Sequence, residues 1–418
     1  MAQDMAIGGQ GAPNHPQAKW MGLIAGLSHN MVIGSLMGSF SVMLASVETR
    51  MGVTRAESSS VGGLVIFGSA IIGAFVGPVM AKYSLRPLMF LGAALMVAGF
   101  VILAFTTSYP LYMASYLLLF GPSMALAGSV GPATLVTRWF TSNRGLALGL
   151  VHLSLVVAVM PLLCTWILEN WGAQATYLTL AVLVGVILFP ATLLIRDYPP
   201  GAAATSATQA RPAPAAPDSL TVPQILAAPA FWAIAIAAGL IITSIMMLTF
   251  NMIQIAGSLG ITGYDAAFLQ AIMAFSGMAG SVLFGWVADR IGGARGLALL
   301  ALNSAALLML LQFDMPYAAR AVVIGLLGLH GAGMIPNVSR ALAHSLGAGS
   351  FSRAFGLQAA LSVPFTIVGI WAMGAAFDAT GSYDFALTGI AVLMLATIPL
   401  AFFAARRAGA AAMPAIPA

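Results

Sequence analysis

The sequence predicts an all-α membrane protein in which twelve transmembrane helices form two pseudo-symmetric six-helix bundles. Three observations lead to this fold class: an extreme composition, apolar segments at regular intervals, and basic residues concentrated in alternate connections. Of the 418 residues, 60% are hydrophobic and 6% are charged, whereas soluble domains carry about 25% charged residues. Because this small number of charged residues cannot cover a water-facing surface, most of the outer surface must contact lipid.

Apolar segments of roughly 20 residues, the length that crosses a bilayer as a helix, recur along the whole chain. Charges or turn residues separate them, which marks each as a separate span. We expect the twelve spans at 20–46, 59–81, 87–107, 110–136, 145–168, 174–195, 229–257, 265–288, 296–313, 318–343, 354–377 and 384–405.

The region between the sixth and seventh spans is rich in Pro, Ala and Ser, a composition typical of a flexible linker. It divides the chain into two halves of six spans each. The expected organisation is therefore an N-terminal tail, an N-terminal bundle, a linker, a C-terminal bundle and a C-terminal tail, at 1–19, 20–196, 197–228, 229–405 and 406–418.

The basic residues predict the orientation, because cytoplasmic loops of membrane proteins carry an excess of Lys and Arg. With a cytoplasmic N-terminus, three of the 16 basic residues lie in external connections: Arg50, Arg55 and Arg320. The remaining 13 of the 16 lie on the cytoplasmic side. We therefore expect a multi-pass protein of the cell inner membrane with both termini in the cytoplasm.

Several function classes are excluded by what the sequence lacks. A single cysteine, Cys164, permits neither an intrachain disulfide nor a metal–thiolate site. There is no Walker loop, no HExxH and no pair of carboxylates suited to catalysis. The basic residues are scattered rather than clustered, which argues against a nucleic-acid partner. We expect no catalytic residue, cofactor or metal, and a monomer whose partners are a small-molecule solute, the lipid bilayer and, if transport is coupled, protons.

Glycine spacing predicts close contacts between helices, because small residues four apart let two helix backbones approach each other. The GxxxG pairs are Gly22/Gly26, Gly34/Gly38, Gly73/Gly77 and Gly145/Gly149. Glycine is also common in apolar helices without such a role.

Three connections resemble those of a known family. The loop Gly285-Trp-Val-Ala-Asp289-Arg290-Ile-Gly292 is similar to the signature loop of the major facilitator superfamily. The segments 138–149 and 378–383 resemble those of its monocarboxylate-porter and oxalate/formate-antiporter branch. The resemblance covers about residues 20–405 and implies a carrier whose two halves rock around a central site.

The sequence also departs from this family. The connection between the second and third spans keeps Gly77, Lys82 and Arg86 but has no acidic residue. Anion-binding members of the branch carry an arginine in the eighth helix and, in some, a lysine in the eleventh. The corresponding positions here are Ser281 and Ser362, which argues against binding of a carboxylate by a fixed cation.

Charged residues at the cytoplasmic helix ends are candidates for a conformational role. In the resembled superfamily, ion pairs at these places hold the two halves together in one state. The alternative is that they reflect the positive-inside rule alone. The candidates are Asp289, Arg290, Arg295, Arg138 and Arg144.

The middle of the predicted spans contains no Asp, Glu, Lys or Arg, and such residues are usually functional when present. Their absence favours a neutral, protonated or weakly charged amphipathic solute. Histidine and amide side chains remain as ligands, although each of them can also serve helix packing. The candidate solute-binding residues are His29, Asn30, His152, Asn251, Gln254, Ser281, His330, Asn337, Gln358 and Ser362. His330 and Asn337 are seven residues apart, which predicts that they share one helix face.

These observations favour a secondary transporter for a small, monocarboxylate-like organic acid or a similar amphipathic metabolite. Without a fixed cation, the acid would travel protonated, or as the anion with a proton on His29 or His330. Two alternatives remain open: an exporter of drugs or neutral hydrophobic metabolites, and a non-transporting membrane sensor. Many exporters carry an acidic residue in the first helix and a Gly/Pro motif in the fifth, and neither is found here.

Overall fold

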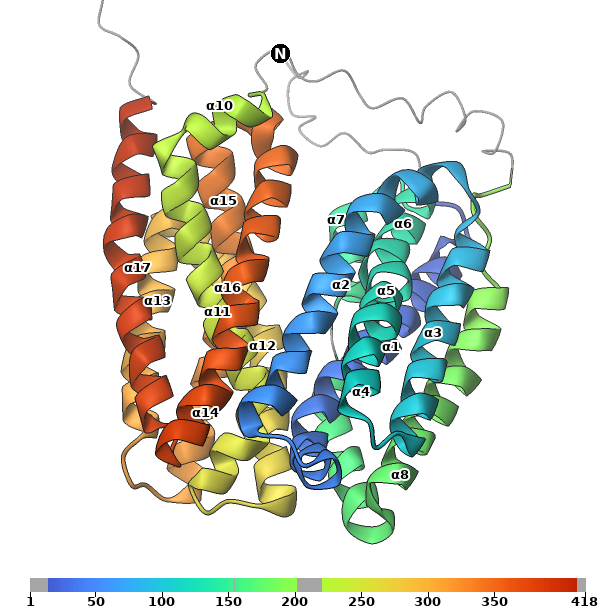
Figure 1. The fold of residues 1–418 in the computed structure, drawn as a ribbon. Helices are drawn as coiled ribbons and strands as arrows, with labels where there is room; N and C mark the ends of the chain where they lie inside the picture. The colour runs from blue at the N-terminus through green and yellow to red at the C-terminus, as the bar shows by residue number, and fades with distance from the viewer. Residues whose placement is uncertain (1–13, 154, 201–219, 412–418) are drawn as a thin grey trace, which may run out of the picture.

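A computed structural model provides the fold, and it describes residues 14–153, 155–200 and 220–411 (Figure 1). The expected tails and linker fall partly outside these ranges, as does Arg211. Where they are described, they are more helical than expected. The first helix begins at Ala18, a short helix α10 (Val222–Ala227) occupies the end of the linker, and the last helix extends to Ala411.

The N-terminal half forms the first six spans. The fourth span is built from consecutive helical pieces, two of which are π-helical. In chain order the elements are α1 (Ala18–Met51), α2 (Arg55–Lys82), α3 (Leu85–Phe105), α4 (Tyr109–Ser115), η1 (Tyr116–Phe120), α5 (Gly121–Ser123), η2 (Met124–Ser129), α6 (Val130–Trp139), α7 (Arg144–Val151) and α8 (Leu155–Leu193).

The C-terminal half repeats the arrangement with longer uninterrupted helices. Its tenth span is divided at Gly333 into two helices. The elements are α11 (Pro229–Ser258), α12 (Gly263–Ile291), α13 (Gly293–Leu311), α14 (Tyr317–Ala332), α15 (Met334–Leu346), η3 (Ala348–Ser350), α16 (Phe351–Thr380) and α17 (Asp384–Ala411).

Eleven helical segments of the described chain are long and apolar enough to cross a membrane. One of them, Leu146–Leu193, has 48 residues, which is about twice the length that one span requires. Gly172 interrupts it with φ 78° and ψ 178°, a backbone conformation incompatible with a helix. The fifth and sixth spans lie on either side of Gly172, and the predicted twelve-helix fold is confirmed.

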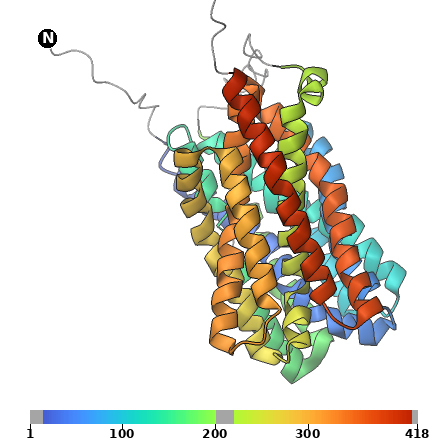
Figure 2. The ribbon, with the colours of Figure 1, turned by 90° about the vertical axis from the view of Figure 1, so that its left-hand side faces the viewer.

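The connections alternate between two ends of the molecule. We call the end that carries α10 the linker end. It also holds the connections that follow α2, α6, α12 and α15. We call the opposite end the far end, and it holds the turn at Gly172 and the connections that follow α1, α3, α11, α13 and α16. Figure 2 shows from a second direction that the long helices run between these two ends.

The two halves approach each other at the far end and diverge toward the linker end (Figure 1). Three helix pairs make the principal contacts between the halves: α1 with α11, α2 with α16, and α8 with α12. Close backbone approach supports the second pair, because a Cβ atom on Gly63 would lie 3.2 Å from the Cα of Ile367. A Cβ on Gly374 would lie 2.6 Å from the Cα of Ala56.

The GxxxG predictions have mixed outcomes. Gly34 and Gly38 let α1 pack closely on α8, where a Cβ on Gly38 would lie 2.5 Å from the Cβ of Met160. Gly22 and Gly26 also face neighbours, Phe140 and Val151. By contrast, a Cβ atom on Gly73, Gly77 or Gly149 would have no described atom outside its local helix within 4 Å. The prediction that these three support a helix contact is wrong for this conformation.

The contrast between Gly38 and Gly73 gives a matched test. Gly38→Ala adds a methyl group where no space exists, and such overpacking costs about 1–3 kcal/mol. Gly73→Ala adds the same group into open space, and Ala in a helix interior makes a protein more stable than Gly by roughly 0.5–1 kcal/mol. Thermal unfolding of the purified protein is expected to show a lower Tm for Gly38→Ala and an equal or higher Tm for Gly73→Ala. Equal losses in both variants would contradict the packing described here.

Candidate functional site

The halves meet through a polar pair in the far-end part of α1 and α11, where Ser41 lies ten residues before the end of α1 and Gln254 four residues before the end of α11. The Gln254 amide Nε2 donates a hydrogen bond to the Ser41 carbonyl at 2.6 Å, and the Ser41 hydroxyl donates to Gln254 Oε1 at 3.2 Å. The backbone N–H of Ile253 donates to Ser41 Oγ at 2.9 Å. Gln254, predicted as a solute ligand, therefore uses its side-chain amide to join the two halves in this conformation.

An aromatic pair adjoins this polar pair. The rings of Phe40 and Phe250 meet edge to face with centroids 4.6 Å apart. Gly62 of α2 lies against both rings, because a Cβ there would be 3.1 Å from Phe250 and 3.2 Å from Phe40. We call Phe40, Ser41, Phe250 and Gln254 the α1–α11 contact. It leaves little room for a solute to pass between α1 and α11.

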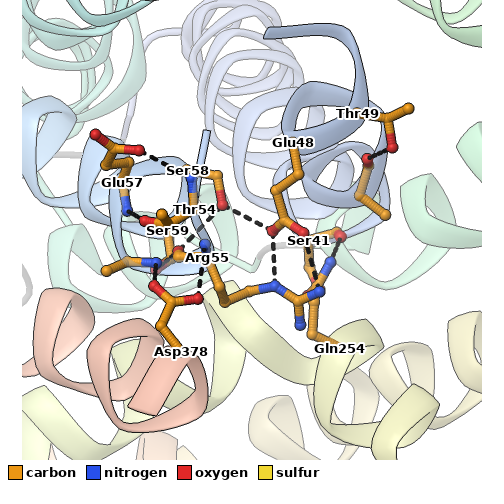
Figure 3. A network of polar contacts seen from close by, with 12 residues as sticks. Ser41, Glu48, Thr49, Thr54, Arg55, Glu57, Ser58, Ser59, Gln254 and Asp378 are labelled. Atoms are coloured by element: carbon orange, nitrogen blue, oxygen red, sulfur yellow. Dashed lines mark hydrogen bonds and ion pairs between the residues drawn. The ribbon is translucent and has the colours of Figure 1, made fainter. Parts of the chain in front are cut away.

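A second contact, the far-end network, joins the halves through Glu48, Arg55, Asp378 and Tyr383, and Figure 3 shows the first three of these. Asp378 lies at the end of α16 and accepts hydrogen bonds from the backbone N–H groups of Arg55 at 3.1 Å and Ala56 at 2.8 Å. These N–H groups begin α2, where a helix has free donors and a partial positive charge. The Asp378 carboxylate therefore caps a helix of the opposite half.

Arg55 forms the other part of the far-end network. Its guanidinium binds Glu48 through Nε at 2.7 Å and Nη2 at 2.9 Å, and Nη1 donates to the Tyr383 hydroxyl at 2.9 Å. The guanidinium also lies 4.6 Å from the centre of the Phe377 ring. Burial raises the pKa of Tyr383 to about 12, although Arg55 opposes the shift, so this phenol keeps its proton at neutral pH.

Sequence reasoning missed most of the residues that join the halves. Ser41 is one of many serines in the first span, and nothing in its spacing distinguishes it. A weaker signal existed for the far-end network, because Arg55 is one of three basic residues assigned to the external side. Asp378 and Tyr383 lie in the segment that resembles the monocarboxylate porters. Their contact with Arg55 depends on the packing of α2 against α16, which no local pattern specifies.

Three predicted residues of the N-terminal half converge where α1 meets α8. The rings of His29 and His152 lie with centroids 4.6 Å apart. Asn30 donates to the Gly26 carbonyl at 3.0 Å and accepts from the Val156 N–H at 3.2 Å. His152 lies at the break between α7 and α8, with Nδ1 2.8 Å from the Leu148 carbonyl oxygen. The structure therefore brings His29, Asn30 and His152 together.

A helix irregularity explains the position of His29. Pro132 has no N–H, so a helix cannot supply a donor to the carbonyl of Gly128 four residues earlier. His29 Nδ1 lies 2.6 Å from this carbonyl oxygen, and the Ser28 hydroxyl donates to the adjacent carbonyl of Ala127 at 2.6 Å. α1 thus satisfies backbone groups that the π-helical part of the fourth span leaves exposed, as the membrane interior requires.

His330 and Asn337 lie in separate helices, because Gly333 ends α14, but both approach Phe284 of α12. The His330 ring lies 5.2 Å from the Phe284 ring, with Nδ1 2.5 Å from the Leu326 carbonyl oxygen. Asn337 Nδ2 donates to Gly333 at 2.7 Å and to the Phe284 carbonyl at 3.4 Å. Its Oδ1 is buried without a hydrogen-bond partner. Asn337 is fully buried and so lies within the packing of the C-terminal half.

The remaining predicted ligands bond mainly to their own helices. Asn251 Nδ2 donates to the Met247 carbonyl at 3.0 Å, while its buried Oδ1 has no hydrogen-bond partner. Gln358 Nε2 donates to Ser362 Oγ at 2.8 Å. The Ser281 hydroxyl donates to the carbonyl three residues earlier at 3.0 Å. No cation stands near Ser281 or Ser362 in these contacts.

The predicted conformational residues lie at the linker end, and their described contacts stay within one half. Arg340 binds Asp289 at 2.5 Å in the C-terminal half. The Arg290 guanidinium lies 3.8 Å from the ring centre of Trp286. Arg144 Nε donates to the Phe140 carbonyl at 3.0 Å, and Arg295 is exposed. A cavity of about 540 Å³ lies beside the Arg340–Asp289 pair.

The N-terminal half has an equivalent ion pair with a different acidic partner. Arg138, at the end of the fourth span, binds Asp197 at 3.1 Å. Asp197 also accepts from the hydroxyl of Ser84 and the N–H of Leu85, each at 2.5 Å, and so caps α3. The carboxylate missing between the second and third spans is thus supplied by the chain that follows the sixth span.

Comparison with known proteins agrees with this architecture. Residues 23–362 match the family model of the Major Facilitator Superfamily. The chain belongs to the Major Facilitator Superfamily. Membership makes it a membrane transporter rather than an enzyme, as the sequence predicts.

Individual relatives are distant members of this superfamily. The MFS-type transporter YcxA of Bacillus subtilis is 25% identical over 191 residues, which cover 45% of this chain and 47% of that protein. The chain thus spans about half the length of this relative. Monocarboxylate transporter 13 of Rattus norvegicus is 23% identical over 400 residues, covering 91% of this chain and 89% of that protein. Its Bos taurus counterpart is 25% identical over 291 residues, which cover 66% of this chain and 62% of that protein. The resemblance to monocarboxylate porters therefore extends over most of the chain.

The far-end network can be tested by the accessibility of Ser59. This buried hydroxyl donates to the Arg55 carbonyl at 2.7 Å, so Ser59→Cys in a Cys164→Ala background reports opening between α2 and α16. Arg55→Gln removes the bonds to Glu48 and Tyr383, and losing a charged hydrogen bond costs about 1.5–3 kcal/mol. We expect an impermeant maleimide to label the introduced thiol about tenfold faster or more when Arg55→Gln is added.

Arg320→Gln is the matched control for Arg55→Gln. Arg320 is also a buried arginine near the far end, but it donates to carbonyls of its own half, those of Leu259 and Phe313. Its substitution is expected to leave labelling unchanged. If both variants were labelled at the same rate, the far-end network would not hold the halves together.

Proposed function

We propose that this chain is a secondary active transporter that moves a small, monocarboxylate-like organic acid or a similar amphipathic metabolite by alternating access. The observation that carries the proposal is the asymmetry between the two ends. At and near the far end the halves are joined by the far-end network and the α1–α11 contact. Toward the linker end they diverge. A carrier that is sealed at one end and separated at the other is one state of an alternating-access cycle.

The same asymmetry, together with the distribution of charge, supports an orientation. Arg50, Arg55 and Arg320 belong to the far end, and the other described basic residues lie at the linker end. By the positive-inside rule, the linker end is cytoplasmic and the membrane is the cell inner membrane. The conformation is then inward-facing, with both termini in the cytoplasm.

The absence of charge midway along the helices supports the choice of solute. In the described chain the acidic and basic side chains lie near helix ends, and Ser281 and Ser362 bond to their own helices. A carboxylate held there would lack a fixed countercharge. The solute therefore enters as the neutral acid or together with a proton on a histidine. The similarity to Monocarboxylate transporter 13, which covers 91% of this chain, adds support for this solute class.

Uptake into proteoliposomes tests the proposal. With a panel of radiolabelled short monocarboxylates and neutral aromatic compounds, we expect at least one monocarboxylate to accumulate. An inward proton gradient is expected to accelerate its uptake severalfold, because the solute and the proton enter together. Equal rates at every gradient would contradict proton coupling, and uptake confined to the neutral aromatics would favour the exporter alternative.

His330→Gln tests whether a histidine carries the proton. His330 is buried beside Phe284, and glutamine retains hydrogen bonding but cannot be protonated near neutral pH. We expect the gradient dependence of uptake to disappear in His330→Gln, in His29→Gln, or in both. His344→Gln, which changes an exposed residue at the linker end, is the matched control and is expected to retain it. Retention in all three variants would exclude a histidine as the carrier.

A further inference from the structure

An arginine and three tyrosines gather inside the N-terminal half near the far end. Tyr112 and Tyr116 come from the fourth span, and Tyr177 comes from the sixth. The exposed fractions of these three tyrosines are 1%, 2% and 1%. Arg50 comes from the last turn of α1, and its guanidinium lies 5.7 Å from the centre of the Tyr177 ring. Arg50 is within electrostatic reach of all three phenol groups.

Two of the polar atoms in this group are buried and have no hydrogen-bond partner: Arg50 Nε and the hydroxyl of Tyr177. Elsewhere in the group, Arg50 Nη2 donates to the Leu103 carbonyl at 2.9 Å, and the hydroxyls of Tyr112 and Tyr116 lie 3.4 Å apart. The ion pairs found among the described residues involve Arg55, Arg138 and Arg340. Arg50 is therefore a cation without a carboxylate partner in this part of the molecule.

The chemistry of the unsatisfied groups indicates what would complete the group. A guanidinium only donates hydrogen bonds, and a phenol donates one. When the two hydroxyls of Tyr112 and Tyr116 bond to each other, one proton of the pair is still free to be donated. A water molecule could accept some of these bonds but would leave the charge of Arg50 uncompensated. A small anion satisfies both the donors and the charge.

The local fold supports a built site rather than a packing accident. The π-helix η1 begins at Tyr116, and π-helical turns within α-helices occur frequently at functional sites. The tyrosines contact apolar rings, because the Phe100 ring stacks on Tyr177 with centroids 6.5 Å apart and the Phe120 ring lies 4.9 Å from that of Tyr116. A low-dielectric surrounding strengthens the attraction between Arg50 and an anion. Arg50 itself is partly exposed, which gives an anion access from the far end.

We propose that Arg50, Tyr112, Tyr116 and Tyr177 bind a small monovalent anion, a halide or a compact carboxylate, inside the N-terminal half. The site is separate from the path between the halves. It adjoins that path through Tyr116, whose ring lies 5.6 Å from Phe40 of the α1–α11 contact. A bound anion therefore stabilises the N-terminal half next to the surface that meets α11.

Thermal unfolding of the purified full-length protein tests the site. Sodium gluconate, whose anion is much larger than chloride or acetate, is replaced stepwise by sodium chloride or by sodium acetate at constant ionic strength. Because a ligand that binds the folded state stabilises it by mass action, we expect Tm to rise by roughly 3 °C or more and then to saturate. A rise with chloride alone identifies a halide site, and a rise with acetate that Tyr177→Phe removes identifies a carboxylate site separate from the transport path. A Tm that is the same in all three salts would overturn the proposal.

Variants decide whether the effect arises at these residues. Tyr177→Phe keeps the ring and removes the unpaired donor, and Arg50→Gln removes the charge; each is expected to lose at least half of the anion-dependent shift. Tyr83→Phe, which alters an exposed tyrosine, and Arg320→Gln are matched controls that should keep the full shift. An undiminished shift in Tyr177→Phe would place the anion elsewhere, and this comparison remains decisive if Arg50→Gln does not fold. Because the readout is stability, it is independent of whether the chain transports a carboxylate.

Discussion

The hydrocarbon interior of a bilayer excludes unpaired charge, and this constraint accounts for most of what the structure shows. Charged side chains are confined to the ends of the helices, so ionic contacts between the halves can form only at those ends. At the far end one arginine, Arg55, binds Glu48 of its own half and Tyr383 of the other. About two helical turns from Glu48 along α1, the halves meet instead through neutral groups, Ser41 with Gln254 and Phe40 with Phe250. The two contacts are therefore expected to respond differently to salt, which screens the ionic one.

The same solvent also requires that every backbone donor and acceptor find a partner. Proline, glycine and π-helical turns break the regular pattern in several spans, and side chains from neighbouring helices repair it. His29 and Ser28 bind carbonyls of the fourth span. Asn30 accepts the N–H of Val156, just past the break between α7 and α8. Residues that look like solute ligands in the sequence therefore also satisfy backbone groups of neighbouring helices.

The fold was predictable from the sequence because it depends on sums over long segments. Twelve apolar spans, a linker and the uneven distribution of Lys and Arg leave little choice of architecture. The site was less predictable, because it depends on which helix faces which. The convergence of His29 with His152 follows from the packing of α1 on α8, and the placement of His330 and Asn337 in separate helices follows from the break at Gly333. The pairing of Arg138 with Asp197 joins residues 59 positions apart, a distance over which no helical period gives information.

Two helices that touch near the far end carry bare surfaces beyond the point of contact. A Cβ atom on Gly73 or Gly77 of α2, or on Gly356 of α16, would have no described neighbour within 4 Å outside the local helix. The same two helices pack tightly at Gly63 and Gly374. A tilt of one half would bring these glycine-containing stretches of α2 and α16 together. The contact between α2 and α16 would then shift along α2 toward the linker end as the halves tilt. The uncovered surface around Gly73, Gly77 and Gly356 would then become part of the interface between the halves. The free energy gained by covering it would offset the loss of the hydrogen bonds of the far-end network.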